Sequence, residues 1–402
     1  MILTIAEEDL VAKRVFLFAL VLATQMTVIA DVVAAEAGSG LNFRIHHEYQ
    51  SLRALGMGDA FVAVANDYSG LFYNPAGLAR REDGNINLYF DFSGSKDIGT
   101  FAQSVEKASK ETNSNQATID VLQSAYGKNF SFHGTAPSGI WVRPNWGVAV
   151  LPLTLTVDLG LHSSLGPSLN ATLIADTIVA YGWAKDFYWL DQGRTSAGFT
   201  VKAINRGYYN ELIHALDLNS QIVKATDLSE GMTVDADLGV LFTPEIPTEG
   251  VISLLRLTKP TFGAVVRNVF DYGFKQDLNV YNKKANTSEP DKLHRRIDIG
   301  SRWEYPEFLI FGGRGVMDVR DILHPQFSLK KGMHLGFEFD WRMFSWWRGQ
   351  YRVGYSQGYL TAGLSALFSY FNFDFATYSE DVGTRDVPRE SRKYEVRFNI
   401  DI

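Results

Sequence analysis

The segment MHLGFEFDWRMFSWWRGQYRVGY, residues 333–355, alternates between large apolar side chains and polar or charged ones. Successive side chains of a β-strand point to opposite faces, so this alternation predicts a strand with two unlike faces. The apolar face carries Leu335, Phe337, Phe339, Trp341 and Met343, and the polar face carries His334, Gly336, Glu338, Asp340 and Arg342. In a soluble sheet the apolar face would contact a protein core. In a transmembrane barrel it would contact lipid, and the charges would line a lumen.

The same alternation recurs along the chain. It is found at Asn85–Ser93, Thr195–Lys202, Thr233–Phe242, Arg296–Tyr305 and Tyr394–Ile402, and in a hairpin over Gln350–Phe368 that turns at Ser356-Gln357-Gly358. We expect strands of about 9–11 residues, the length of a tilted membrane crossing, whereas soluble strands average about 5–6. Aromatic residues also gather at strand ends, as in Phe344-Ser345-Trp346-Trp347, where they suit the lipid headgroup level. These features favour a membrane barrel over a soluble sandwich or propeller.

A sheet that faces lipid must close on itself, because each unpaired backbone group in hydrocarbon costs several kcal/mol. We therefore predict an all-β fold, a closed transmembrane antiparallel β-barrel of about 14 strands with an N-terminal plug and a few short helices. Thr100–Tyr126 is polar and rich in helix formers, which predicts one or two surface helices. Tyr208–Thr226 is expected to be a short amphipathic helix and Lys275–Leu293 a polar loop.

The composition excludes several classes of function. The chain has 402 residues, no cysteine and a formal net charge of −7. The absence of cysteine excludes disulfides, thiolate metal sites, a cysteine nucleophile and a lipid-anchored cysteine. No basic stripe accompanies the mildly acidic balance, so nucleic acid is not an expected partner.

Residues 1–37 have the organisation of a secretory signal peptide. The basic pair Lys13-Arg14 precedes the apolar run Val15–Ala30, and Ala35-Glu36-Ala37 offers a small-residue cleavage site. A single anchor helix is the alternative, although the run is short for a span of about 20 residues. We expect cleavage to leave residues 38–84 as a plug and residues 85–402 as the barrel, located in the cell outer membrane of a Gram-negative bacterium.

The segment before the first expected strand has the character of a plug. Ser51–Glu82 is too apolar to hang free in solvent and too irregular for a barrel strand. Gly56 and Gly58 permit a tight backbone path. Asn74 suits a helix N-cap, with Pro75 at the first helical position.

The stretch LGMGDAFVAVANDYSGLFYNPAGLA, residues 55–79, resembles the N-terminal signature of the FadL-like outer-membrane superfamily. That superfamily includes long-chain fatty-acid transporters, PorV-type proteins of secretion systems and TraF-type proteins of conjugation operons. Further similar stretches are IVAYGWAKDF, AGFTVKAINRGYY, DADLGVLFTP, GAVVRNVFDYG and YRVGYSQGYLTAGLSALFSYFNFDFATYSEDVGT. The N-terminal stretch is more similar to the PorV and TraF types than to the fatty-acid transporters.

The resemblance implies a 14-stranded barrel whose N-terminal segment folds into the lumen as a hatch. Transporters of this superfamily take up hydrophobic ligands by diffusion through the wall near the hatch, whereas PorV-type members shuttle or anchor secreted proteins. The candidate plug and gating residues are Gly56, Gly58, Asn74, Pro75 and Ala76. They act either in ligand passage or only as a packing turn.

Charged residues on the polar faces of the later strands are candidates for a lumen network. They are Asp298, Arg302, Glu304, Glu338, Asp340 and Arg342. Lone charges shielded from water are costly, so we expect these residues to form ion pairs that stiffen the barrel or clamp the plug.

No catalytic residue, cofactor or metal site is expected. The pair Gly56-x-Gly58 lacks the third glycine of a dinucleotide site, and neither HExxH nor GxSxG occurs. The adjacent His46 and His47 would point apart on an extended chain and so would not share a metal ion. A barrel enzyme with catalytic groups at its rim remains a third reading, for which the sequence names no residues.

The leading hypothesis is therefore passive uptake of small, fatty-acid-like hydrophobic molecules through an outer-membrane barrel. The alternative is a non-transporting scaffold or shuttle that binds proteins of a secretion or conjugation system. In both cases the expected partners include outer-membrane lipids and the barrel-assembly machinery. The final strand resembles the signal which that machinery recognises, although Ile402 stands where a terminal aromatic residue is usual.

Overall fold

The computed structural model describes residues 44–161, 168–187, 193–214, 227–249, 251–275, 278–283, 288–308, 311–344, 346–383 and 388–402. The chain divides into two units, Met1–Gly40 and Leu41–Ile402, and the described fold belongs to the second. The predicted signal peptide, residues 1–37, lies outside the described residues, as does the latter part of the predicted helix Tyr208–Thr226.

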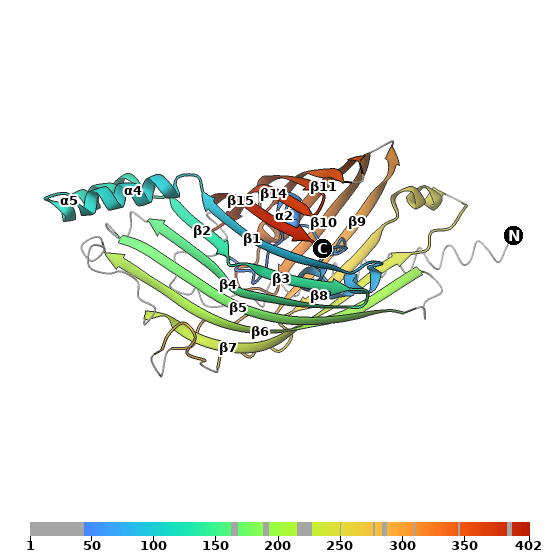
Figure 1. Ribbon diagram of the computed structural model, residues 1–402, viewed down its shortest axis with the longest axis horizontal. Helices are drawn as coiled ribbons and strands as arrows, with labels where there is room; N and C mark the ends of the chain where they lie inside the picture. The colour runs from blue at the N-terminus through green and yellow to red at the C-terminus, as the bar shows by residue number, and fades with distance from the viewer. Residues whose placement is uncertain are drawn as a thin grey trace. The chain divides into compact units, whose positions relative to one another are not determined.

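The described strands form one antiparallel sheet that closes into a barrel (Figure 1). They are β1 (Asn85–Ser95), β2 (Asn129–Thr135), β3 (Ser138–Arg143), β4 (Trp146–Leu161), β5 (Ser168–Phe187), β6 (Gly193–His214), β7 (Ser229–Pro244), β8 (Thr261–Arg267), β9 (Arg296–Phe308), β10 (Phe311–Ile322), β11 (Met333–Phe344), β12 (Trp347–Ser356), β13 (Tyr359–Phe368), β14 (Phe371–Asp381) and β15 (Glu390–Asp401). Closure is made by β15 and β1, which pair from Asn87 opposite Asp401 to Ser95 opposite Lys393.

β2 and β3 share one position in the barrel wall, because each pairs with β1 on one side and with β4 on the other. The sheet of 15 strands therefore fills 14 positions, one of them occupied by two short strands in line. This arrangement confirms the predicted closed barrel of about 14 strands. Closure leaves no row of unpaired backbone groups facing lipid.

The wall is apolar outside and charged inside, as the alternation predicts. Phe337 and Phe339 of β11 are 46% and 52% exposed, whereas Glu338 between them is buried. The neighbouring strand repeats this pattern, with Val353 exposed and Arg352 buried. An apolar exterior around a polar interior is the arrangement of a barrel in the outer membrane.

Some strands are longer than the single crossing of about 9–11 residues that the sequence predicts. β1 has 11 residues and β15 has 12, but β5 has 20 and β6 has 22. The helix expected from Tyr208 was wrong in its described part, because Tyr208–His214 is the end of β6 and pairs with Ser168–Ile174 of β5. Pairing with a neighbouring strand satisfies the backbone and overrides the helix-like spacing of the apolar residues.

The described helices are short. They are α2 (Leu52–Gly56), α3 (Gly70–Tyr73), α4 (Ile98–Ser109), α5 (Ser114–Ser124), α6 (Leu329–Gly332), and the 3-10 helices η1 (Pro75–Arg80) and η4 (Val251–Thr258). The sequence predicts one or two surface helices within Thr100–Tyr126, and the structure has two, α4 and α5, which extend beyond the end of β1 in Figure 1. No helix among the described residues is long and apolar enough to cross a membrane.

The two ends of the barrel differ in their connections. Short turns join β9 to β10, β11 to β12 and β13 to β14 at the end where β15 finishes, whereas the β1–β2 connection with α4 and α5 lies at the other end. Outer-membrane barrels have short periplasmic turns and longer extracellular loops. We therefore name the end with the short turns the periplasmic end.

Residues 44–84, which we name the N-terminal segment, lie against the inner face of the wall. Most of their side chains are buried. α2 contacts β12 to β15, and η1 contacts β4 to β7. Because these strands belong to different sides of the wall, the segment crosses the lumen. Its action as a gate stays a prediction.

Candidate functional site

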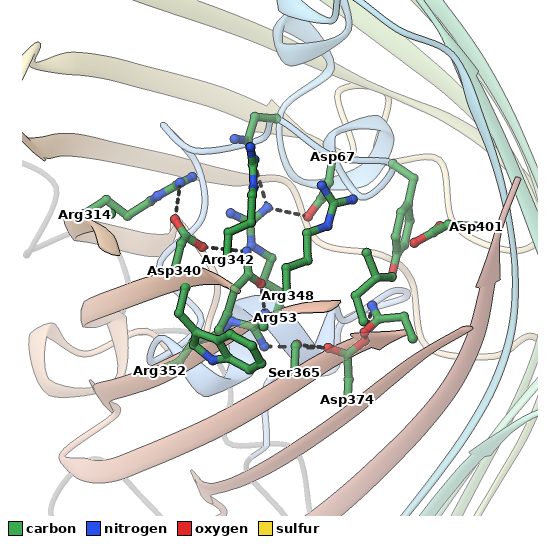
Figure 2. A pocket seen from close by; sticks show the side chains of 18 of the residues that line it. Arg53, Asp67, Arg314, Asp340, Arg342, Arg348, Arg352, Ser365, Asp374 and Asp401 are labelled. Carbon is green, nitrogen blue, oxygen red and sulfur yellow. Dashed lines mark hydrogen bonds and ion pairs between the residues drawn. The ribbon is translucent and has the colours of Figure 1, made fainter. Parts of the chain in front are cut away.

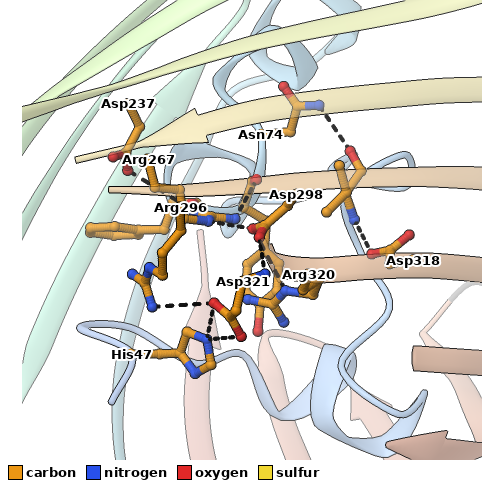
Figure 3. Close-up of polar contacts among 12 residues, drawn as sticks. His47, Asn74, Asp237, Arg267, Arg296, Asp298, Asp318, Arg320 and Asp321 are labelled. Carbon is orange, nitrogen blue, oxygen red and sulfur yellow. Dashed lines mark hydrogen bonds and ion pairs between the residues drawn. The ribbon is translucent and has the colours of Figure 1, made fainter. Parts of the chain in front are cut away.

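Asn74 fastens the N-terminal segment to the barrel wall. Its side-chain oxygen accepts a hydrogen bond of 3.1 Å from the Ala76 backbone N–H, and it is the N-cap residue of η1, which starts at Pro75. Its side-chain amide donates a hydrogen bond of 2.9 Å to the Val62 carbonyl oxygen, which is drawn in Figure 3. The same amide donates a hydrogen bond of 3.2 Å to the carbonyl oxygen of Val240 in β7. The predicted cap is thus present, and it also joins two parts of the segment to the wall.

The wall beside this turn is made of glycines that leave room for it. A Cβ at Gly239 would lie 2.2 Å from the side-chain oxygen of Asn74. A Cβ at Gly198 would lie 2.8 Å from the carbonyl carbon of Pro75. Asn74, Pro75 and Ala76 therefore pack directly on β6 and β7, which is the arrangement of a packing turn.

Gly56 and Gly58 make the corresponding close approach on the opposite side of the lumen. A Cβ on Gly56 would lie 3.0 Å from Cα of Gly363 in β13. Gly58 has a φ of +68°, and its Cβ would lie 2.4 Å from the carbonyl oxygen of Leu335 in β11. The tight backbone path expected here is therefore present, with backbone packed on backbone.

The first group of lumen charges surrounds Asp298 (Figure 3). Asp298 pairs with Arg267 at 2.5 Å and lies 3.7 Å from Arg320. Arg320 in turn pairs with Asp59 of the N-terminal segment. Arg267 also donates to the backbone carbonyl of Tyr73, at 2.8 Å. The wall thus holds α3 and the preceding loop through charged hydrogen bonds.

Glu48 brings a second charged residue of the segment into the same region. It pairs with Arg296 of β9 at 2.9 Å and lies 4.0 Å from Lys202 of β6. Burial alone would raise the pKa of Glu48, but Lys202 and Arg296 outweigh burial and hold the pKa well below its ordinary value. The carboxylate is therefore charged and clamped between two strands.

The second group of lumen charges is centred on Glu338. Arg53 of α2 binds it through two hydrogen bonds, and Arg352 of β12 donates to it at 2.9 Å. Arg314 of β10 lies 3.4 Å from the same carboxylate. A single buried acid on β11 therefore gathers three arginines from three elements.

The remaining predicted network residues are dispersed. Asp340 pairs with Arg314 at 2.9 Å, beside the Glu338 group. Arg302 and Glu304 lie 3.5 Å apart and form a pair of their own. The Arg342 side chain has no hydrogen bond or ion pair among the described residues. The structure thus separates the predicted single network into two groups, one local pair and one unpaired arginine.

Sequence reasoning missed the partners that come from the N-terminal segment. These are His47, Glu48, Arg53 and Asp59, together with the wall residues Arg267, Arg296, Arg314, Arg320, Asp321 and Arg352. The wall residues could have been found by extending the two-residue alternation to every strand. Nothing in the local sequence marks which charged wall residue each segment residue meets.

The two adjacent histidines point apart, as predicted. His46 Nε2 lies 3.3 Å from Asp176 and His47 Nε2 lies 3.0 Å from Asp321.

Elsewhere in the described lumen, three side chains place potential metal-ligand atoms within 4.8 Å of one another: Asp91, His133 and Glu395.

Arg397 bears on this cluster, because it already pairs with Asp91. The arginine therefore compensates one of the two carboxylates without a metal ion, and the cluster carries no metal assignment.

The wall is interrupted where β2 ends and β3 begins. Ala136 and Pro137 separate the two strands, and Pro152 of β4 lies beside them, in a stretch where the β4–β5 register shifts. Proline has no backbone N–H to donate to the ladder. On the β1 side, the Asp91 N–H donates to the Thr135 hydroxyl, at 3.0 Å, instead of a backbone carbonyl. We name this interruption the wall break.

Apolar side chains lie on the inner face next to the wall break. Tyr89 of β1, Ile140 of β3 and Leu151 of β4 belong to one buried cluster with Tyr49 and Phe72 of the N-terminal segment. The rings of Tyr49 and Phe72 are stacked, with centroids 4.4 Å apart. This part of the lumen thus holds aromatic and aliphatic side chains, and the Arg397 guanidinium lies 4.4 Å from the ring centroid of Tyr89 and 5.9 Å from that of Tyr49.

A cavity of about 720 Å³ opens at the periplasmic end (Figure 2). Its lining includes Arg53 and Asp67 of the N-terminal segment, several residues of β10 to β14, and Asp401 near the end of the chain. Asp67 accepts a hydrogen bond of 2.8 Å from Arg53. The lining is mostly polar, which differs from the apolar pocket that a lipid-like ligand would need.

Comparison with known proteins finds similarity only at the level of structure, since no family model and no curated protein matches the sequence. The CymD monoaromatic hydrocarbon channel matches with a TM-score of 0.45 and 10% identity, over 87% of this chain and 96% of that chain. A Pseudomonas aeruginosa FadL homologue matches with a TM-score of 0.43 and 10% identity, over 90% of this chain and 98% of that chain. The Pseudomonas putida toluene transporter TodX matches with a TM-score of 0.43 and 9% identity, over 92% of this chain and 98% of that chain. These similarities concern the fold of the chain alone.

Proposed function

We propose that this barrel takes up small hydrophobic molecules passively, with fatty-acid-like molecules as the ligand class that the N-terminal resemblance implies. The observation that carries the proposal is the position of the wall break beside an apolar part of the lumen. A hydrophobic molecule dissolved in the outer leaflet would meet the wall where β2 and β3 are separated, and where, among the described residues, a single backbone hydrogen bond from Ala136 to Leu153 joins the connection to β4. Behind the wall it would meet the aromatic and aliphatic side chains of this cluster, with the charge of Arg397 already paired with Asp91.

The N-terminal segment is the element that must move for such a molecule to pass. Tyr49 and Phe72 fill the apolar region next to Tyr89, Ile140 and Leu151. Displacement of these two rings would leave an apolar site of matching character, because ring and ligand would exchange contacts with the same wall residues.

A reversible tether tests this proposal. A Cβ added at Gly182 of β5 would lie 2.5 Å from Cδ1 of Leu71, the residue before Phe72. Cysteines at these two positions would have side chains that face each other, and the chain contains no other cysteine. We expect the oxidised Leu71→Cys/Gly182→Cys variant, reconstituted in liposomes, to take up radiolabelled oleate or toluene at less than about a tenth of the wild-type rate.

The same double variant after reduction is the matched control, and its uptake should return. Toluene is included because one of the similar barrels is a toluene transporter. Equal uptake by the oxidised and reduced forms would show that the segment does not have to move. Wild-type liposomes that take up neither probe faster than protein-free liposomes would contradict uptake itself.

A second function, a non-transporting scaffold for a secretion or conjugation system, is favoured by one specific observation. Ion pairs fill the lumen around Glu48, Arg267 and Arg296, where the space among these residues amounts to about 10 Å³. A lumen packed in this way suits a rigid platform. Recovery of a stoichiometric protein partner from mild-detergent extracts, together with unaltered uptake in a deletion strain, would favour the scaffold.

A further inference from the structure

The cavity at the periplasmic end carries an excess of arginine donors. Six arginines contribute to its lining, against four aspartates. In Figure 2 the labelled arginines gather on one side, and Asp401 lies apart from them on the other. This inference concerns the chemistry of that cavity and does not depend on the proposed uptake of hydrophobic molecules.

Arg342 and Arg348 are the central observation. They are direct cross-strand partners on β11 and β12, and both are exposed to the cavity. Neither side chain has a hydrogen bond or ion pair among the described residues. Like charges directly opposite each other on neighbouring strands destabilise a sheet. Replacement of either arginine by an uncharged residue would remove this repulsion and increase the stability of the sheet.

Two further arginines of the lining have buried nitrogen atoms without a hydrogen-bond partner. The Arg352 side chain is only 1% exposed, and its Nη1 has no hydrogen bond, since Asp374 is 3.7 Å away. Arg314 Nη1 is also buried and unpartnered, although its Nη2 bonds to Asp340. Unmade hydrogen bonds of buried charged groups are costly, so these donors suit an acceptor inside the cavity.

The aspartates of the lining do not supply that acceptor. Asp340 already accepts from Arg314 at 2.9 Å and from Gln350 at 2.7 Å. Asp67 is engaged by Arg53 and by Ser69. Each acid is therefore satisfied locally, while the arginine pair at the cavity surface is not.

The remaining two aspartates are also engaged. Asp374 accepts from Asn372 and Asn399, and Asp401 accepts from Asn85 and Asn87. The lining thus has spare donors and no spare carboxylate facing them.

We propose that this cavity binds a small molecule bearing a phosphate or carboxylate group, which enters from the periplasmic side and is held by Arg342 and Arg348. Guanidinium groups bind such oxyanions through paired, charge-assisted hydrogen bonds. An anion between the two arginines replaces their mutual repulsion with attraction. The cavity of about 720 Å³ falls within the usual size range of small-molecule sites, about 300–1,000 Å³.

The test measures anion binding to the detergent-purified full chain by isothermal titration calorimetry in low-salt buffer. Inorganic phosphate and citrate are the two probes, and glycerol is the uncharged comparison. Wild type is compared with Arg342→Gln, Arg348→Gln and the double variant. Arg392→Gln is the matched control, because Arg392 is a partly exposed arginine of β15 that pairs with Glu390 away from the cavity.

We expect the double variant to bind its anion roughly ten- to a hundredfold more weakly than wild type, and Arg392→Gln to bind it like wild type. Binding of phosphate alone assigns a phosphate-type ligand, and binding of citrate alone assigns a carboxylate-type ligand. Binding of neither anion to wild type would overturn the proposal. Undiminished binding by the double variant, or an equal loss in Arg392→Gln, would also overturn it.

Thermal melting provides a second measurement, and its first part requires no ligand. In anion-free buffer, Arg348→Gln should melt at a higher temperature than wild type, because the substitution removes the repulsion from Arg342. Addition of the bound anion should raise the melting temperature of wild type more than that of the variant. Equal melting shifts in both proteins would contradict a site built from this pair.

Discussion

Arg53 of the N-terminal segment and Glu338 of β11 form a two-pronged ion pair, with Nε to Oε2 at 2.8 Å and Nη2 to Oε1 at 2.7 Å. The Glu338 side chain has no exposed surface. Parallel hydrogen bonds between guanidinium and carboxylate fix orientation as well as distance. This pair therefore sets how α2 sits on the wall, and its arginine also lines the cavity at the periplasmic end.

Replacement of Glu338 by glutamine should destabilise the folded protein strongly. The substitution leaves Arg53 and Arg352 buried without their anion, and breaking a buried pair in this way costs about 3–5 kcal/mol. Chemical unfolding in detergent measures the change in the free energy of unfolding. Glu390→Gln, at an acid that is 44% exposed, is the control and should change stability by less than about 1 kcal/mol. Similar losses in the two variants would contradict a clamping role for Glu338.

Alanine at Gly58 should be far more damaging than alanine at Gly99. Gly58 has a φ of +68° and its Cβ would lie 2.4 Å from a backbone oxygen, whereas a Cβ at Gly99 meets nothing within 4 Å. Gly99 lies inside α4, where alanine is favoured over glycine by about 1 kcal/mol. Thermal unfolding should thus show a lower melting temperature for Gly58→Ala and an unchanged or higher one for Gly99→Ala. The opposite order would mean that the segment does not follow this path.

Asn74 should tolerate neither alanine nor aspartate, and aspartate should be worse. Alanine removes the cap of η1 and both amide donors, at a cost of about 1–3 kcal/mol. Aspartate keeps the acceptor for the Ala76 N–H but turns a negative charge toward the carbonyl oxygens of Val62 and Val240. Limited proteolysis of the N-terminal segment reports its detachment. If aspartate restored wild-type resistance, the amide donors would have no part in holding the segment.

Glu48 should make the folded state sensitive to acid. Its folded pKa lies well below the ordinary value, because Lys202 and Arg296 outweigh the effect of burial. The stabilisation is therefore complete above the unfolded pKa of about 4.3 and is lost as the pH falls through the lower folded pKa. Melting temperatures of wild type and Glu48→Gln should differ most above pH ~4.3 and converge at lower pH. A constant difference across the acid range would count against this assignment.

Much of the wall could be predicted from sequence because its two faces meet unlike surroundings. On β11 each outward residue contacts lipid and each inward residue lies among charged side chains, so apolar and polar residues alternate along the sequence. The same reasoning failed for Tyr208–His214, where a strand continues beyond the alternating core of β6. There the pairing with β5, and not the local pattern, decides the structure.

The candidate site was less accessible to sequence reasoning because its pairs form only on closure. Asp91 and Arg397 are 306 positions apart and meet because β15 joins β1. Arg302 and Glu304 could be paired in advance, since residues two apart on a strand share a face. Arg53 could not be assigned to Glu338, because nothing near it in sequence places α2 against β11.

The apolar face of the wall meets lipid, and its charged face meets the N-terminal segment. Single cysteines introduced along residues 335–343 of β11, in a chain that has none of its own, can carry a fluorophore in liposomes containing brominated lipid. We predict strong quenching at 337 and 339 and weak quenching at 340 and 342, whose side chains face the cavity, with a period of two along the strand. Quenching that is uniform along the strand, or absent at every position, would contradict the barrel and everything derived from it.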